Sequence, residues 1–185
     1  MENVKILGLS GSLRRGSFHS ALLRAAKELL PEGAELEIYD ISKIPFFNQD
    51  LEQSIPEEVQ KFKEAIRKAD ALLFASPEYN HSISGVLKNA IDWASRPPND
   101  NVFDGKPAAI ISASTGAYGG IRAQYHLRQV FVYLNIHAIN RPQIAIPFAD
   151  QKFDKDGNLI DEKVRENLRE QLKSLVDWAI RIKRI

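Results

Sequence analysis

The chain has 185 residues, with 25 Lys or Arg against 24 Asp or Glu, so its formal net charge is +1. This balance gives no reason to expect a nucleic acid or an anionic membrane surface as the main partner. Cysteine is absent, which excludes disulfides, thiolate catalysis and cysteine-ligated metals.

The length suits one domain, 1–185, with a full hydrophobic core. The first residues are charged and lead directly into a short apolar run, so we expect no signal peptide. No apolar stretch approaches the roughly 20 residues that a membrane helix needs. We therefore predict a cytoplasmic protein with no membrane partner.

Apolar runs and helical patterns alternate along the chain. Runs typical of strands lie at 4–9, 36–41, 71–76, 107–114 and 137–147, the last interrupted by Pro142. Patterns typical of helices lie at 18–30, 56–69, 84–95 and 121–134, and a final one begins near Asp161. This alternation predicts an α/β fold, with a five-stranded parallel sheet in the order 2-1-3-4-5 between two helix layers.

The longest irregular stretch, 148–160, holds Asp154, Asp156 and Gly157 at spacings that resemble a calcium loop. Aligned on Gly157, the first and last ligand positions fall on Lys152 and Lys163, where oxygen ligands are required. We therefore predict an Asp-Gly turn and no metal site.

The first predicted strand runs into "SGSLRRGSFHS" at 10–20, and we call residues 10–17 the first loop. Gly11 and Gly16 have the spacing of a Walker A loop, but Ser17 and Phe18 stand where Lys and Ser or Thr are needed. The glycines also do not fit the dinucleotide pattern Gly-x-Gly-x-x-Gly. A nucleoside triphosphatase and a dinucleotide fold are both disfavoured.

The polar side-chain groups of the first loop are hydroxyls and guanidinium groups. Ser10, Ser12 and Ser17 offer hydroxyls, and Arg14 or Arg15 can bind two oxygens at once. Together with the following helix start, these groups suit a terminal phosphomonoester held without a metal. The alternative is an ordinary polar turn with a serine N-cap.

Two more unusual loops follow predicted strands. In the second loop, "SPEYN" (76–80), Pro77 ends a strand and frees backbone groups that could face a planar heterocycle. In the third loop, "ASTGAYGG" (113–120), three glycines allow close approach to a flat ligand. Each could be an ordinary loop, but in the 2-1-3-4-5 order the three lie side by side. A phosphate at the first and a planar ring between the others describe flavin mononucleotide (FMN).

Four segments, "GSLRRGSF", "PEYN", "SGVLKNAIDW" and "YGGIRAQYHLRQ", closely resemble the NAD(P)H-dependent FMN reductases. This family includes bacterial quinone, chromate and azo-dye reductases. The resemblance extends from the first strand to about residue 147. It implies a flavodoxin-like fold with FMN bound tightly but non-covalently, and a homodimer or homotetramer in which helices 84–95 and 121–134 take part.

The resemblance also assigns residues to the cofactor. The segment 12–19 would hold the phosphate, with Arg14 and Ser17 prominent. One departure is His19, where many relatives carry Asn; an imidazole can also hydrogen-bond a phosphate, and adds charge if protonated. The predicted cofactor-binding residues are Ser10, Ser12, Leu13, Arg14, Ser17, Phe18 and His19 in the first segment, Pro77, Glu78, Tyr79 and Asn80 along the flavin ring, and Ala113, Ser114 and Gly116 on its other side.

The implied activity is ping-pong hydride transfer from NADPH or NADH through FMN to quinones, azo dyes, chromate or free flavin. No protein nucleophile or acid–base pair is needed, so we predict no catalytic residue, and expect the backbone of Glu78 to matter more than its carboxylate. Two alternatives stay open. One is a flavodoxin-type electron carrier without NAD(P)H turnover, which the net charge of +1 disfavours because flavodoxins are usually strongly acidic. The other is an interaction domain that has lost the flavin.

Overall fold

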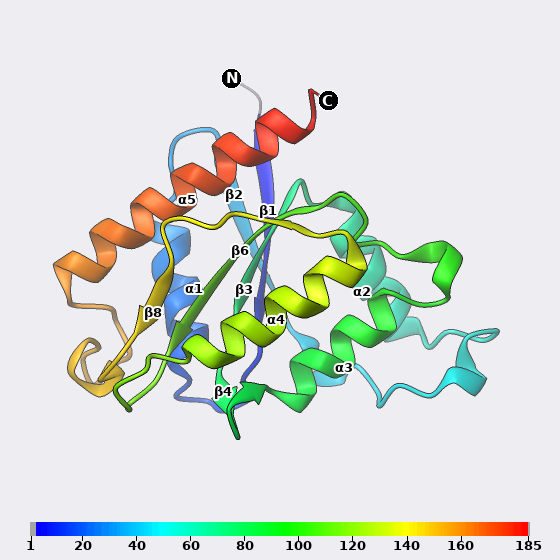
Figure 1. Cartoon of the computed structure of the whole chain (residues 1–185), viewed down its shortest axis with the longest axis horizontal. Coiled ribbons are helices and arrows are strands. Elements are labelled where there is room, and N and C mark those ends of the chain that lie inside the picture. The colour runs from blue at the N-terminus through cyan, green and yellow to red at the C-terminus, as the bar shows by residue number, and fades with distance from the viewer. Residues whose placement is uncertain (1–2, 185) are drawn as a thin grey trace.

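A parallel β-sheet forms the centre of the protein, whose computed structural model describes residues 3–184 (Figure 1). Its strands are β1 (Val4–Ser10), β2 (Ala34–Tyr39), β3 (Ala71–Ala75), β6 (Pro107–Ala113), β7 (His137–Ala138) and β8 (Ile144–Ile146). The helices are α1 (Phe18–Glu28), α2 (Glu57–Lys68), α3 (Gly85–Ala94), α4 (Ile121–Leu134) and α5 (Glu162–Ile182). A separate hairpin consists of β4 (Glu78–Tyr79) and β5 (Ser82–Ile83).

The sheet has the order β2-β1-β3-β6-β7, and β8 also pairs with β6. β7 lies beside Pro107 and Ala108, whereas β8 lies beside 111–113 at the other end of the same strand. The fifth position is therefore shared by two short strands, with Pro142 in the segment that separates them. The predicted order 2-1-3-4-5 is confirmed, as is the interruption of the last strand.

The remaining differences from the predicted elements are local. The second strand ends at Tyr39 rather than residue 41, because the Asp40 carboxylate accepts a hydrogen bond from the Ser42 amide and starts a short 3₁₀ turn. The hairpin β4–β5 was not predicted; Asn80 and His81 form its turn with φ values of 50° and 63°. Such a turn normally carries Asn-Gly or Asp-Gly, so "YNHS" gives a weak sequence signal.

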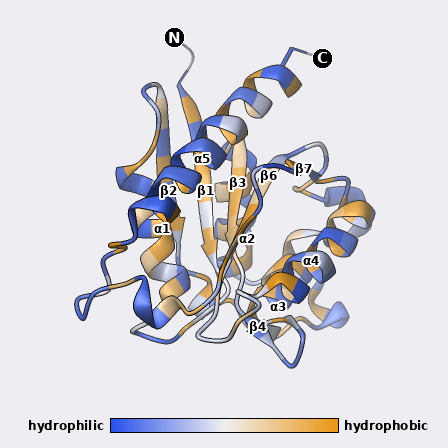
Figure 2. Ribbon diagram, turned by 60° about the vertical axis from the view of Figure 1, so that its left-hand side comes forward, coloured by the Kyte–Doolittle hydropathy of each residue, from blue (hydrophilic) through white to orange (hydrophobic). Residues whose placement is uncertain are grey.

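Two apolar layers flank the sheet. One packs α1 and α5 against it and includes Leu22, Leu73 and Leu172. The other packs α2, α3 and α4 against the opposite face. Figure 2 shows the largely apolar strands between helices that carry both hydrophilic and hydrophobic segments. Every residue of β3 and β6 is buried, as expected for parallel strands covered on both sides.

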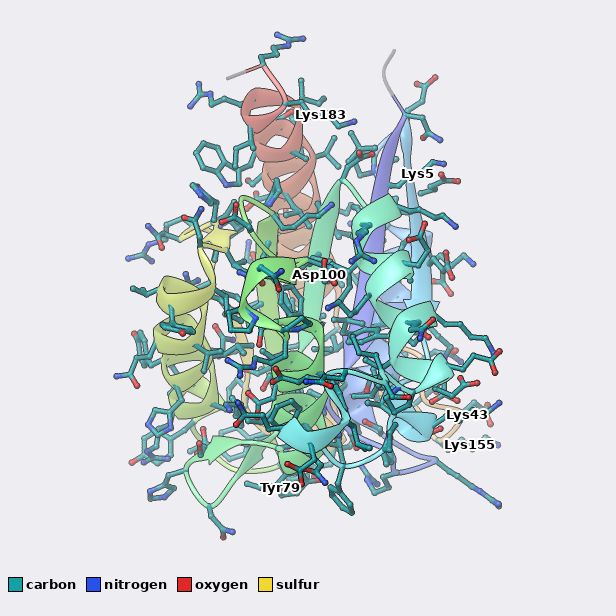
Figure 3. The ribbon with its side chains drawn as sticks, turned by 90° about the vertical axis from the view of Figure 1, so that its right-hand side faces the viewer. Lys5, Lys43, Tyr79, Asp100, Lys155 and Lys183 are labelled. Carbon is teal, nitrogen blue, oxygen red and sulfur yellow. The ribbon has the colours of Figure 1, made fainter. Side chains whose placement is uncertain are left out.

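The carboxyl ends of β1, β3 and β6 lie along one edge of the sheet, because the strands are parallel neighbours. Figure 3 shows Tyr79 at this edge with Lys43 and Lys155, opposite Lys5 and Lys183. The irregular stretch before α5 forms the predicted turn, in which the Asp154 carboxylate accepts from the amides of 156 and 158. Among residues 3–184, no helix combines the length and apolar composition of a membrane span.

Candidate cofactor site at the carboxyl edge of the sheet

The first loop connects β1 to the start of α1. Ser17 is the N-cap of that helix, and its hydroxyl accepts hydrogen bonds from the amides of His19 and Ser20 at 3.1 and 3.4 Å. The Ser10 hydroxyl lies 3.1 Å from that of Ser20, and the Ser12 hydroxyl accepts from the Arg14 amide at 3.4 Å. These local bonds shape the loop around the N-terminus of α1.

The loop fits a phosphate because it leaves donors free. Among residues 3–184, the backbone N–H groups of Leu13, Arg15 and Gly16 have no hydrogen-bond acceptor, and all three residues are exposed. The exposed Arg14 guanidinium lies 5.5 Å from the centre of the Phe18 ring, which holds it beside the helix start. Free amides, a guanidinium and the positive end of a helix dipole together favour an anion.

The second loop packs tightly against the first. A Cβ on Gly11 would lie 2.7 Å from Cδ of Pro77, so only glycine allows the two loops to approach this closely. Ser84 strengthens the contact: its hydroxyl donates to the Gly11 carbonyl at 2.6 Å and accepts from the amide of Leu87 as the N-cap of α3. The first two loops and α3 therefore form one unit.

Glu78 links the second loop to α4. One carboxylate oxygen accepts from the amides of Arg122 and Ala123 at 3.0 and 3.3 Å, and the other accepts from the Arg122 guanidinium at 3.2 Å. The N-cap residue of α4 is Gly120, which has no side chain to serve this helix end. The Glu78 carboxylate is thus the cap of α4, at a helix end where a negatively charged group is stabilising.

The third loop is fixed by contacts with β8. A Cβ on Gly119, whose φ is +59°, would lie 2.6 Å from the backbone of Ala145. The Ser114 amide donates to Ile146, and the Ser114 carbonyl accepts from Ala149, both at 2.9 Å. Between these contacts lies Phe148, which has a φ of 49° and a half-exposed ring.

His19 lies inside the site rather than on its surface. Its side chain is 6% exposed, and Nε2 accepts a hydrogen bond from the Ala113 amide at 3.4 Å. Burial, and then the positive charge of Arg14, lower the pKa of His19 to about 4. The ring is therefore neutral near pH 7, and the added charge considered from the sequence does not arise there.

The structure brings all predicted cofactor residues to this one edge, while their contacts with FMN remain a prediction. Exposed residues are available to a ligand through their side chains, whereas buried ones are available through the backbone or by supporting a neighbour. The exposed group is Leu13, Arg14, Tyr79, Asn80 and Gly116, the half-buried group is Phe18, Glu78 and Ser114, and the buried group is Ser10, Ser12, Ser17, His19, Pro77 and Ala113.

Sequence reasoning missed three residues at this edge. Ser84 could have been found, because a serine directly before a helical pattern is an N-cap signal. Arg122 pairs with Glu78, 44 residues away in the chain, and stacks 4.3 Å from the Tyr118 ring centre, and no local pattern indicates either contact. Phe148 follows no motif, and nothing in the sequence indicates its place beside the third loop.

A hollow of about 350 Å³ lies beside the first loop, lined by hydroxyls of Ser10, Ser12 and Ser42 and by Arg14. Hollows of about 550 and 690 Å³ lie along β2 and α2, and another of about 440 Å³ lies between α3 and α4, all away from the three loops. Basic and acidic side chains both line the two surfaces along β2 and α2, whereas serines and arginines predominate beside the first loop, which favours an anion there.

A doubly wound parallel sheet with three such loops at its carboxyl edge defines a flavodoxin-like protein. Residues 4–151 match the family described as NADPH-dependent FMN reductase. The chain is 52% identical over 183 residues to an NAD(P)H-dependent FMN reductase of Pseudomonas aeruginosa, covering 98% of each. It is 50% identical over 186 residues to an NADPH:quinone oxidoreductase of Arabidopsis thaliana, covering 97% of this chain and 93% of that one.

The solved structure of FerB, a flavoenzyme NAD(P)H:(acceptor) oxidoreductase from Paracoccus denitrificans, superposes with a TM-score of 0.89. The two chains are 34% identical, over 96% of this chain and 98% of FerB. The protein therefore belongs to the NADPH-dependent FMN reductase family. The predicted fold, family and oxidoreductase class are confirmed.

Proposed function

We propose that this protein binds FMN tightly at the three loops and uses it to reduce quinones with NADPH or NADH. The observation that carries the proposal is the set of free amides in the first loop, at the N-terminus of α1 and beside a guanidinium. Relatives at 52% and 50% identity are called an FMN reductase and a quinone oxidoreductase, which supports the same cofactor and acceptor class.

Each part of the site has a separate task in this proposal. The amides of Leu13, Arg15 and Gly16 and the Arg14 side chain hold the phosphate. The backbone of the second loop from Pro77 onward and the backbone at Ser114 bind the polar edge of the flavin ring. When bound, FMN supplies the redox chemistry, which is hydride acceptance from NAD(P)H and electron donation to the acceptor.

The exposed aromatic rings at the rim bear on the second substrate. Tyr79, Tyr118 and Phe148 are 54%, 64% and 46% exposed. Such rings can stack on planar molecules, which suits nicotinamide, quinones and azo dyes alike. If NAD(P)H and the acceptor use this open face in turn, the kinetics are ping-pong. Chromate and free flavin are further acceptors to test, and a cytoplasmic location stays a prediction.

An anaerobic titration tests the proposal. The purified protein is saturated with FMN, freed of excess, and mixed with one equivalent of NADPH or NADH while the visible flavin absorption is recorded. Bleaching within seconds, and recovery when a benzoquinone is added, are expected. Protein that retains no FMN would refute the site assignment. Flavin bands that persist with both nucleotides would favour the flavodoxin-type carrier instead.

We also propose that the protein is a homodimer or homotetramer. One stripe of α4 is apolar and exposed. It holds Tyr125, which is 56% exposed, and Val132 and Tyr133, which follow it by seven and eight positions and are 83% and 87% exposed. A hollow of about 440 Å³ between α3 and α4 is lined in part by Ile91 and Val130. Exposed apolar stripes of this kind mark interaction surfaces. Light scattering should give a multiple of the 20.9 kDa chain, and Val132→Lys should shift it toward the monomer.

A further inference from the structure

The backbone hydrogen bonds between β3 and β6 stop at the edge where the three loops meet, and a side chain takes the next position. The last backbone rung of this ladder is the hydrogen bond from the Ser76 amide to the Ile111 carbonyl, at 2.9 Å. In a regular parallel ladder, the next rung would run from the Ala113 amide to the Ser76 carbonyl. The Ala113 amide donates instead to Nε2 of His19.

We propose that the His19 imidazole replaces this rung, with Nε2 accepting from the Ala113 amide and Nδ1–H donating to the Ser76 carbonyl. A neutral imidazole has one acceptor and one donor nitrogen, which are the groups needed to bridge an amide and a carbonyl. The bridge holds the two strand ends farther apart than a direct rung would. His19 is therefore a positioning residue that sets the gap between the second and third loops.

The surroundings of the ring agree with this arrangement. The side chain is buried, so an unpaired ring nitrogen would be unfavourable. The backbone of Ser76 hydrogen-bonds the ring and raises its pKa, as a carbonyl acceptor does, while burial and Arg14 lower the pKa further than this bond raises it. The net result is a neutral ring, and only a neutral ring can accept from Ala113 and donate to Ser76 together.

The bridge also joins the first loop to the other two. His19 lies in the first turn of α1, and its own amide donates to the Ser17 hydroxyl, the N-cap of that helix. His19 thus contacts three places at once. These are the start of α1, which follows the first loop, and the ends of β3 and β6, which precede the second and third loops. The functional meaning of the bridge depends on the proposed FMN site, whereas its geometry does not.

Imidazole ¹⁵N–¹H correlation spectra of the flavin-free protein test the geometry directly. We expect the His19 signals to show a proton on Nδ1 and none on Nε2, unchanged between about pH 7.5 and pH 5.5. The His19→Gln spectrum identifies the signals by their loss, and the exposed His126 serves as a reference. A proton on Nε2, or titration of the ring within this range, would overturn the proposal.

A pair of variants tests the effect on the site. His19→Leu removes both hydrogen-bonding groups at similar size, whereas the amide of His19→Gln offers an acceptor and a donor. We expect the FMN dissociation constant to rise about tenfold or more in His19→Leu, the scale of one lost buried hydrogen bond. His19→Gln should stay within about threefold, on the same scale.

The control is Leu175→Ala, which creates a core cavity at a buried position of α5, outside the segments that form the three loops. It should lower the melting temperature without changing FMN affinity. If it weakens FMN binding as much as His19→Leu does, the effect is general destabilisation and the positioning role is refuted. If the wild type itself binds no FMN, the proposed function fails, and the nitrogen spectra still decide whether the bridge exists.

Discussion

Replacement of Glu78 separates a structural carboxylate from a catalytic one. In Glu78→Ala, the amides of Arg122 and Ala123 lose their acceptor at the start of α4, and the Arg122 guanidinium loses its partner. Glu78→Gln keeps a carbonyl oxygen for the amides and removes only the charge. The two variants should therefore differ in stability, although both lack the carboxylate.

The contacts of Glu78 give the expected loss in the free energy of unfolding. A side-chain cap contributes about 1 kcal/mol, and a negative charge near a helix N-terminus adds about 0.3–1 kcal/mol. The Glu78 side chain is only 12% exposed, so its pair with the 36%-exposed Arg122 adds a few tenths more. Glu78→Ala should lower the free energy of unfolding by about 2 kcal/mol, or about 4–8 °C in melting temperature for a chain of this size. Glu78→Gln should lose about half of that.

Thermal unfolding and steady-state kinetics on the same preparations provide the assay. If the carboxylate acts only as a cap, kcat of Glu78→Gln with NADPH and a benzoquinone should stay within about threefold of the wild type. A loss of about 100-fold or more in kcat at unchanged melting temperature would indicate general acid–base catalysis, and would refute this reasoning. Equal melting temperatures for Glu78→Ala and the wild type would refute the cap itself.

Three further changes test the first loop and the ring beneath it. Arg14→Ala should weaken FMN binding by about 1.5–3 kcal/mol, the scale of a hydrogen bond to a charged group, and Arg15→Ala, measured by the same fluorescence titration, should lose less. Ser17→Asp keeps an N-cap but places an anion beside the phosphate, so it should fold and remain colourless, whereas the neutral Ser17→Asn should stay yellow. Because the folded-state pKa of His19 lies near 4, below its unfolded value, the unfolded chain binds the extra proton between about pH 6.5 and 4. The free energy of unfolding of the wild type, measured in urea, should therefore decrease as the pH is lowered from about 6.5 to 4. The decrease should be steeper than that of His19→Gln, and equal slopes for the two proteins would contradict the assignment of this protonation to His19.

Local hydrophobic patterns in the sequence were sufficient to predict the fold. Periodicity located the helix 121–134 without error, since Leu127, Phe131 and Leu134 face the sheet. Continuous apolar runs identified β3 and β6, because strands covered on both faces need no polar alternation. The hairpin after β3 was missed for the opposite reason: its strands have two residues each, and its turn uses His81 where glycine is usual.

Within the candidate site, contacts inside one segment were predictable from the sequence, whereas contacts between two distant segments were not. Ser17 caps the helix that follows it directly, so its role could be read from three consecutive residues. Glu78 serves a helix 44 residues later, and His19 contacts an amide 94 positions away. Sequence motifs assigned all three residues to the candidate site. Only the folded structure shows that Glu78 and His19 contact elements next to other loops.

In the proposed function, one edge of the sheet holds a single cofactor and accepts planar partners of varied chemistry, and the contacts that join the loops bear on both tasks. Two of these ties are buried, Ser84 to Gly11 and His19 to Ala113, and the tie from Glu78 to α4 is partly buried. They fix backbone groups, which a cofactor of defined shape must match. The aromatic rings of the rim above them, Tyr79, Tyr118 and Phe148, are exposed. We infer that the buried layer determines which cofactor is held, whereas the rim accepts planar partners of varied chemistry, so changes at the ties should alter FMN affinity before acceptor preference.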